Sequence, residues 1–243
     1  MRKYKAAIFD MDGTVLDTSG DLTDAMNHVM EEAGHRHDYT VRDGCEFFGS
    51  GVGVAVRRAL ALECGAPRES LVAIGTPEEV LPQAAMRFIP DEENRLQEAF
   101  RSYYGAHCDI KTGPYPGIKE AIEKLRQAGV ITALVSNKPD EAVKTLADDF
   151  FKGLFDLAVG EKKGMRRKPA PDMTLAVLRA LAVDRHDAVY LGDSEIDLQT
   201  AANSGMDCIS VSWGFRSVEF LKAHGAKVIA SDPCELFSLV YGS

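Results

Sequence analysis

The chain has 243 residues, of which 45% are hydrophobic and 27% charged, a composition typical of a water-soluble globular protein with one large domain or two smaller ones. Its formal net charge of −9 argues against a nucleic-acid surface, and no apolar run approaches the ~20 residues of a membrane-spanning helix. The five cysteines are scattered and form no Cys-x-x-Cys pair, which favours reduced thiols in a cytoplasmic protein over a disulfide or zinc framework.

A short buried strand is predicted over residues 6–9, because its apolar residues follow one another without a polar interruption. Two carboxylates, Asp10 and Asp12, follow it directly, and Gly13 then allows the backbone to turn sharply. In an open parallel sheet, ligands and chemistry collect at the carboxyl ends of the strands. The pair therefore suggests a nucleophile beside a proton-transfer partner, and a simple polar turn is the alternative.

Residues 17–108 are predicted to form helices and loops without a strand. A helix over residues 19–33 follows from the helical spacing of its apolar side chains, at Leu22, Met26, Val29, Met30 and Ala33. Further helices are expected over residues 54–64, as a short segment from Pro77, and over residues 91–107, whose acidic first turn suits the helix dipole. This block is therefore interpreted as a helical domain.

From Lys111 onwards, predicted strands and helices alternate. The strands are expected at residues 130–135, 157–159, 188–191, 208–211 and 227–229. The alternation indicates an α/β fold with a doubly wound parallel sheet, which the first strand must join. The helical block is then an insertion, a cap domain of residues 17–108 within a core domain of residues 1–16 and 109–243.

Polar residues stand at or just beyond the ends of four predicted strands: Asp10 and Asp12, Ser136 and Asn137, Lys168, and Asp193 with Asp197. Because parallel strand ends meet at one edge of a sheet, these side chains are expected to share a crevice. Four carboxylates facing one lysine would repel one another, and a divalent cation relieves that repulsion. An oxygen-only ligand set suits Mg²⁺ better than zinc, so the constellation predicts metal-assisted phosphoryl transfer.

The sequence resembles the haloacid-dehalogenase superfamily of phosphatases, whose four motifs match Asp10-Met11-Asp12-Gly13-Thr14, Ser136, Lys168 and Gly192-Asp193-Ser194-Glu195-Ile196-Asp197. One such motif alone is a weak signal, but four in the family's order are a strong one. The resemblance covers essentially the whole chain. It implies a Rossmann-like core and a small α-helical cap that opens and closes over the active site.

The resemblance also implies catalytic roles. Asp10 would be the nucleophile that forms an aspartyl-phosphate, and Asp12 would protonate the leaving group and later deprotonate the attacking water. Lys168 would neutralise the charge of the nucleophile and the phosphate. Dehalogenases lack a second acid at the position of Asp12, because halide needs no protonation, so its presence favours a phosphatase.

The metal and phosphate ligands follow from the same motifs. Mg²⁺ would be bound by Asp10, the backbone carbonyl of Asp12, and Asp193. Asp197 would support the metal or Lys168 from among the residues that surround the direct ligands. The phosphoryl oxygens would be bound by Ser136 and the backbone amide that follows it, with Asn137 and Thr14 as further ligands.

Within the superfamily, the chain is more similar to the phosphoglycolate phosphatase-like subfamily. Matching segments include Phe48-Gly49-Ser50-Gly51, Arg58-Ala59-Leu60 and Tyr115-Pro116-Gly117. The implied substrate is a small phosphorylated metabolite, acted on by a monomer or homodimer with no nucleic-acid or membrane partner. Arg57 or Arg58 is a candidate to bind a substrate carboxylate, although arginines on a helix are usually solvated.

Other functions stay open. Pyrophosphatases and sugar-phosphate phosphatases share this cap type, and a phosphotransferase similar to β-phosphoglucomutase would reuse the aspartyl-phosphate. A phospho-aspartate receiver domain also combines clustered acids with a lysine. Receivers, however, carry the phosphorylated aspartate on a later strand, and no acid ends the strand predicted at residues 130–135.

Overall fold

The computed structural model describes residues 3–87 and 91–242. The chain divides into two compact units, which we call the core unit (Met1–Asp17 with Gly113–Ser243) and the cap unit (Thr18–Thr112). The second boundary lies four residues beyond the predicted one, because the backbone amides of Lys111 and Thr112 donate to the Asp21 carboxylate at 2.9 Å and so attach these residues to the cap unit.

The core unit contains a six-stranded parallel sheet in the order β5-β4-β1-β6-β7-β8. Its strands are β1 (Ala6–Phe9), β4 (Ile131–Pro139), β5 (Leu157–Glu161), β6 (Ala188–Gly192), β7 (Asp207–Val211) and β8 (Ile229–Ala230). The fully buried β1 lies between β4 and β6, with Phe9 paired to Leu134 on one side and to Leu191 on the other. The predicted doubly wound sheet is confirmed, and its strand order reverses beside β1.

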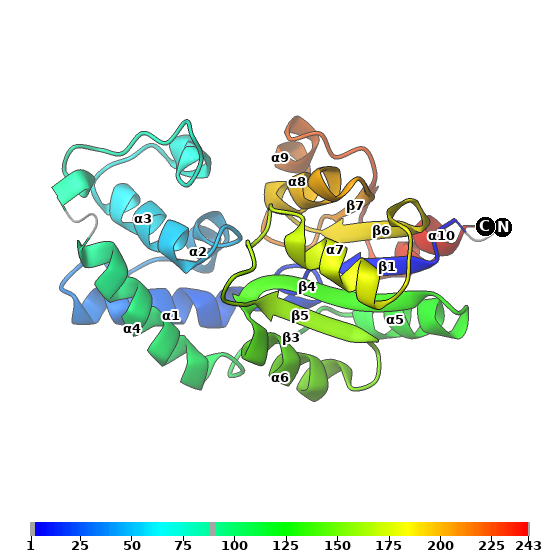
Figure 1. Ribbon diagram of the computed structural model, residues 1–243. Helices are drawn as coiled ribbons and strands as arrows, with labels where there is room; N and C mark the ends of the chain where they lie inside the picture. The colour runs from blue at the N-terminus through cyan, green and yellow to red at the C-terminus, as the bar shows by residue number, and fades with distance from the viewer. Residues whose placement is uncertain (1–2, 88–90, 243) are drawn as a thin grey trace. The chain divides into compact units, whose positions relative to one another are not determined.

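Helices cover both faces of this sheet (Figure 1). Alternate residues of β1 point to opposite faces, so Ala7 and Phe9 pack with one set of helices and Ala6 and Ile8 with the other. The first set is α5 (Ile118–Gln127), α6 (Asp140–Phe151) and α10 (Leu236–Tyr241). The second set is α7 (Asp172–Ala180) and α8 (Glu195–Ser204).

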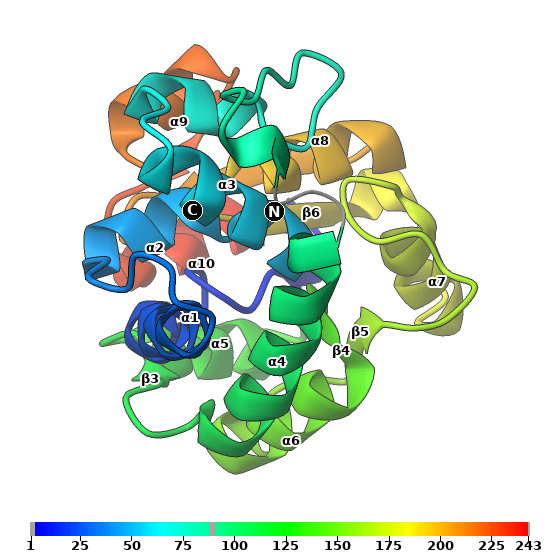
Figure 2. The ribbon, with the colours of Figure 1, turned by 90° about the vertical axis from the view of Figure 1, so that its left-hand side faces the viewer.

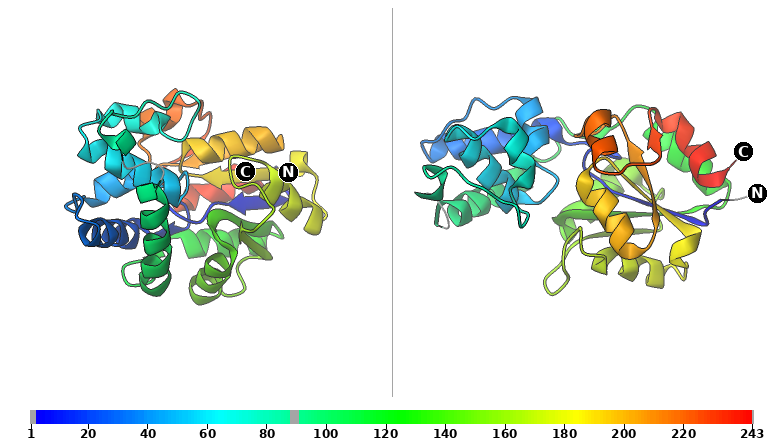
Figure 3. Two further views of the ribbon diagram at one scale, coloured as in Figure 1. Left: turned by 60° about the vertical axis from the view of Figure 1, so that its left-hand side comes forward. Right: turned by 90° about the horizontal axis from the view of Figure 1, so that it is seen from above.

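Hydrogen bonds also join the two ends of the core unit. The Lys3 and Tyr4 amides donate to the carbonyls of Tyr241 and Val240, so the approach to β1 runs beside α10 (Figure 3). The core unit also contains the two-stranded ladder of β2 (Leu16–Asp17) with β3 (Gly113–Pro114), the helix α9 (Val218–Ala223), and short 3₁₀ helices at Arg185–Asp187 and Pro233–Glu235.

Some predicted element ends were wrong. β4 continues four residues past the predicted end at Val135, through a register shift against β5 that restores pairing at Pro139. The helix after β6, α8, begins at Glu195. The Ser194 side chain and Asp197 form a capping box there, which starts the helix among the polar residues that follow β6.

The cap unit is helical, as predicted (Figure 2). Its α-helices are α1 (Ser19–Glu32), α2 (Val41–Phe47), α3 (Val52–Glu63) and α4 (Asp91–His107). The unpredicted α2 begins at a capping box between Thr40 and Asp43. The helix predicted from Pro77 was wrong, because the Glu79 carboxylate accepts from the Gly75 amide and pairs with Arg57, and this holds the segment as a turn.

Candidate active site

The end of β1 places Asp10 beside a buried lysine. The Asp10 side chain is 11% exposed, and its Oδ1 accepts from the Met11 amide at 2.7 Å and lies 2.7 Å from the Nζ of Lys168. The same Nζ donates to Oδ1 of Asp197 at 2.9 Å. The other oxygen of Asp197 accepts from the amide and hydroxyl of Ser194. Lys168 is thus held between two carboxylates that come from different strand ends.

Asp193, which follows β6, is enclosed by backbone. Its Oδ2 accepts from the Phe215 amide at 2.6 Å, and the Thr14 hydroxyl lies 3.3 Å from its Oδ1. A Cβ added at Gly13 or Gly214 would come within 2.3 Å of an Asp193 atom, so only glycine leaves room for the carboxylate. Thr14, predicted to bind phosphate, is fully buried and directs its hydroxyl to Asp193 instead.

Asp12 faces the end of β4. Its Oδ1 lies 3.1 Å from the Nζ of Lys138, and its Oδ2 lies 3.5 Å from the hydroxyl of Ser136. No site role was predicted for Lys138. Because the strand was predicted to end at Val135, strand periodicity did not extend to Lys138, and its position facing Asp12 follows from the longer β4.

The Asn137 side chain binds the loop that carries Lys168. Its Nδ2 donates to the Lys168 carbonyl at 3.1 Å, and its Oδ1 accepts from the Lys168 amide at 2.8 Å. The expected phosphate contact of the backbone amide that follows Ser136 stays a prediction. The side-chain amide binds the backbone that carries Lys168, which holds the lysine loop against the end of β4.

Burial dominates the electrostatics of this cluster. It raises the pKa of Asp10 well above the usual range, and the nearby Asp197 carboxylate adds to the effect. Burial also raises the pKa of Asp193 to about 7, again with a contribution from Asp197. For Lys168, burial opposes the charged form, but Asp10 and Asp197 outweigh it and raise the pKa of the ammonium above its ordinary value.

The acids fit a hard divalent cation. Asp10, Asp193 and Asp197 each offer one oxygen, and these atoms lie within 4.8 Å of one another. All three groups are carboxylates, the donors that Mg²⁺ and Ca²⁺ prefer.

Comparison with known proteins agrees with this arrangement. The family model for haloacid dehalogenase-like hydrolases matches residues 7–211. The chain belongs to this family. A curated phosphoglycolate phosphatase from Pseudomonas savastanoi pv. phaseolicola is 30% identical in sequence to this chain. The match covers 94% of this chain and 74% of the relative. A candidate pyrophosphatase, PpaX, from Caldanaerobacter subterraneus is 26% identical over 99% of the chain and 96% of the relative.

A solved structure is closer still to this haloacid dehalogenase-like hydrolase. The crystal structure of a candidate phosphoglycolate phosphatase from Lactobacillus delbrueckii subsp. bulgaricus is 58% identical, covers both chains completely and superposes with a TM-score of 0.96. The comparison extends over the cap unit as well as the core unit. The resemblance stated from the four motifs is therefore confirmed.

Arg58 of this hydrolase lies inside the cap unit, which corrects its predicted role as a substrate ligand. The residue is 1% exposed. Its guanidinium donates to the carbonyls of Phe47 at 3.0 Å and Ile74 at 3.2 Å, and to the Ser50 hydroxyl at 3.3 Å. Arg57 is likewise paired, with Glu79 and Glu93. Arg58 therefore joins the loops around α3, and the sequence pattern did not reveal these carbonyl partners.

Replacing Arg58 should destabilise the cap unit. Arg58→Met keeps an apolar stem but leaves buried carbonyls without a donor, so we expect a loss of about 2–4 kcal/mol. Thermal unfolding followed by circular dichroism measures the effect. Arg42→Met, at a side chain that is 83% exposed, is the matched control and should be nearly neutral. Equal melting temperatures for the two variants would contradict the assignment.

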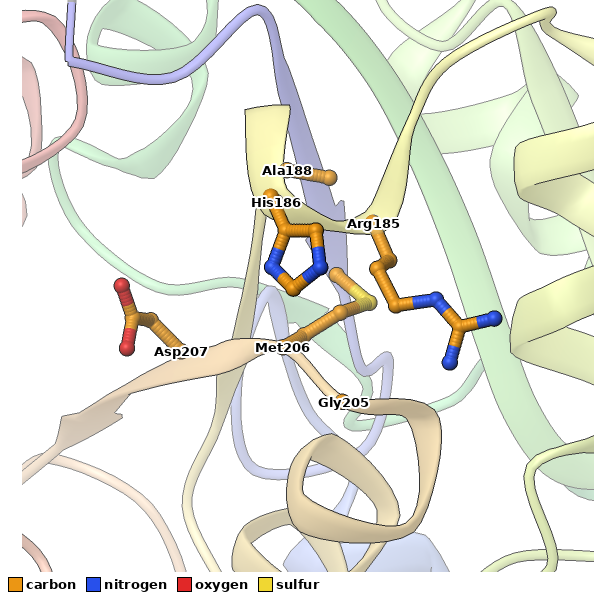
Figure 4. A pocket seen from close by; sticks show the side chains of 6 residues that line it. All are labelled: Arg185, His186, Ala188, Gly205, Met206 and Asp207. Carbon is orange, nitrogen blue, oxygen red and sulfur yellow. The ribbon is translucent and has the colours of Figure 1, made fainter.

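A cavity of about 300 Å³ lies elsewhere in the core unit (Figure 4). It is lined by Arg185, His186, Ala188, Gly205, Met206 and Asp207. Ala188 and Asp207 are the first residues of β6 and β7, whereas Asp193 follows the last residue of β6. The cavity therefore lies at the opposite edge of the sheet and is separate from the acidic cluster.

No described helix is both long and apolar enough to cross a membrane.

Proposed function

We propose that the protein is a Mg²⁺-dependent phosphomonoester hydrolase that works through an aspartyl-phosphate on Asp10. The observation that carries this proposal is the position of Asp10, at a strand end, 2.7 Å from the Lys168 ammonium and within 4.8 Å of the other acids of the cluster. A carboxylate nucleophile needs no base, but it needs positive charge beside it to approach an anionic phosphate.

Each residue then has a defined task. A carboxylate oxygen of Asp10 attacks phosphorus while the bond to the leaving oxygen breaks, and Asp12 gives its proton to that oxygen. In the second half, Asp12 takes a proton from water as the water oxygen attacks phosphorus, and the Asp10 carboxylate is regenerated with release of phosphate. The Lys168 ammonium offsets the charge on Asp10, and the Ser136 hydroxyl is placed to donate to a phosphoryl oxygen.

The bound metal would be held by Asp10, the Asp12 backbone carbonyl and Asp193, and it would stabilise negative charge on the phosphoryl oxygens. Asp197 supports this set by pairing with Lys168. Oxygen donors in a backbone-lined site, with acids whose pKa is raised by burial, favour a cation of this kind.

For the substrate we propose 2-phosphoglycolate, a small phosphorylated metabolite of the cytoplasm. Relatives named as phosphoglycolate phosphatases match 94% of the chain, and the net charge of −9 disfavours nucleic acid. Inorganic pyrophosphate is the second candidate, since a relative of nearly equal length bears the pyrophosphatase name. A phosphotransferase activity similar to that of β-phosphoglucomutase is a further alternative. We propose a monomer or homodimer without a membrane partner.

Phosphate release from a panel of substrates tests the proposal. The panel is 2-phosphoglycolate, pyrophosphate, several sugar phosphates and p-nitrophenyl phosphate, each with Mg²⁺ and with EDTA. We expect Mg²⁺-dependent release that is fastest with 2-phosphoglycolate. Preference for another compound would keep the mechanism and replace the substrate. No Mg²⁺-dependent release from any compound would overturn the proposal.

Metal binding should depend on pH. An unfolded aspartate has a pKa near 3.9, whereas burial raises that of Asp193 to about 7. Between these values the folded, metal-free protein binds more protons than the unfolded chain, so this contribution to stability is present at low pH and is lost as pH rises through 7. Mg²⁺ must displace the same proton, so its apparent affinity should rise by up to about tenfold per pH unit below 7.

Thermal unfolding at pH 5.5 and pH 7.5, with EDTA or with Mg²⁺, measures this dependence. We expect Mg²⁺ to raise the melting temperature more at pH 7.5 than at pH 5.5. The Asp193→Asn variant is the control and should lose most of that difference. A stabilisation by Mg²⁺ that is equal at the two pH values would contradict the prediction.

A further inference from the structure

The end of β4 presents a second buried lysine to the site. Lys138 has a side chain that is 5% exposed, and its Nζ lies 3.1 Å from Oδ1 of Asp12. Its backbone amide donates to the Ser136 hydroxyl at 3.1 Å, and that hydroxyl faces the other oxygen of Asp12. Both oxygens of the Asp12 carboxylate therefore face the same short segment of β4.

This segment is anchored at both ends. Residues on either side of it pair with β5, Val135 with Val159 and Pro139 with Glu161, and the intervening residues form the register shift. Asp12 follows β1 and forms a β-bridge with Leu16, and its side chain is 20% exposed. The contact between Lys138 and Oδ1 of Asp12 is an ion pair without hydrogen-bond geometry, and the contact between Ser136 and Oδ2 is at the 3.5 Å limit of a hydrogen bond. The ion pair is therefore the shorter of the two contacts that restrain this carboxylate.

The charges of the site lead to the same residue. The carboxylates of Asp10, Asp12, Asp193 and Asp197 face the ammonium groups of Lys168 and Lys138. The two lysines also divide the acids between them, since Lys168 pairs with Asp10 and Asp197, whereas Lys138 pairs with Asp12.

We infer that Lys138 is a positioning residue for Asp12, and this inference rests on the proposed function. The ammonium fixes the direction of the Asp12 side chain, so that its acid form meets the leaving group in the first half-reaction and its carboxylate meets the attacking water in the second. Because proton transfer depends steeply on the geometry of the acid, a displaced Asp12 slows both halves even though every catalytic group is still present.

Steady-state kinetics of Lys138→Met and Lys138→Arg with 2-phosphoglycolate, whose leaving alkoxide must be protonated, test this role. We expect Lys138→Met to lower kcat about 10- to 100-fold, with KM and the half-saturating Mg²⁺ concentration changed less than about twofold. Lys138→Arg keeps a cation, so its kcat should be higher than that of Lys138→Met. On a logarithmic scale, we expect it to regain at least a third of the decrease in kcat that Lys138→Met causes. Lys152→Met, at an exposed residue that follows α6, is the matched control and should equal the parent.

A double-mutant cycle separates positioning from a structural role. If Lys138 acts through Asp12, adding Lys138→Met to Asp12→Asn should cost less than about twofold in kcat. A residue that merely stabilises β4 would cost the same factor in both backgrounds, and that result would overturn the inference. A raised KM at unchanged kcat would also overturn it and make Lys138 a substrate ligand. If Lys138→Met does not fold, Lys138→Gln enters the same cycle.

Failure of the proposed function would look different. The unsubstituted protein would then show no Mg²⁺-dependent release of phosphate from any substrate. With that activity present, each outcome of the cycle either supports the positioning role of Lys138 or contradicts it.

Discussion

Asp10→Asn should lower phosphate release by on the order of 10⁴-fold or more, because the amide oxygen is too weak a nucleophile to form the covalent intermediate. The substitution keeps the shape of the side chain. The asparagine Oδ1 can still accept from the Met11 amide and from Lys168, and Lys168 retains its pairing with Asp197. The fold should therefore survive, and the loss should appear in kcat. Phosphate release under saturating Mg²⁺ measures it.

The control for Asp10→Asn is Asp149→Asn, which makes the same chemical change at an exposed position of α6. It should retain the activity of the parent. Mg²⁺-dependent turnover that persists in Asp10→Asn would show that another residue attacks phosphorus, and the covalent mechanism proposed for this site would fall.

Asp12→Asn should have the second largest effect, a loss of about 10²- to 10⁴-fold with 2-phosphoglycolate, since the asparagine neither donates the proton to the alkoxide nor removes one from water. The effect should depend on the leaving group. p-Nitrophenolate leaves without protonation, so the first half-reaction with p-nitrophenyl phosphate should stay fast while hydrolysis of the aspartyl-phosphate becomes slow.

Stopped-flow absorbance follows this difference. We expect a burst of p-nitrophenolate close to one equivalent of enzyme from Asp12→Asn, followed by slow turnover. Asp10→Asn, measured in parallel, should give no burst. If Asp12→Asn lost the same factor of activity with both substrates and gave no burst, the prediction would be contradicted. Asp12 would then act in a step before bond breaking and not in proton transfer.

The position of the acids could be predicted because it depends on few rules. A buried apolar strand identifies β1, and parallel strands must end at a common edge, so Asp10, Lys168 and Asp193 had to approach one another once the sheet was inferred. Strand and helix periods similarly predicted the sheet, its layers and the helical cap. Element ends were less predictable. The starts of α2 and α8 depend on side-chain capping, and β4 is extended by pairing with β5.

The partners of individual polar side chains were decided by the tertiary structure. Asn137 binds the backbone of Lys168, Thr14 contacts Asp193, and Arg58 binds carbonyls within the cap unit, although each was predicted to bind substrate. A polar residue near a site has several possible acceptors, and the one that it reaches is set by strand stagger and loop path over distances of a few ångströms.

Lys138 illustrates the same division between sequence and structure. Its place two residues after Ser136 is plain from the sequence, but the strand was predicted to end before both residues. Only the fold shows that Lys138 meets Asp12 rather than solvent, because Asp12 lies more than 120 residues away in the chain and is brought there by the pairing of β1 with β4. By itself, the sequence determined which chemical groups stand at the strand ends, since residue type and period are local properties. The tertiary structure decided which of those groups touch, since contact depends on how distant segments pack.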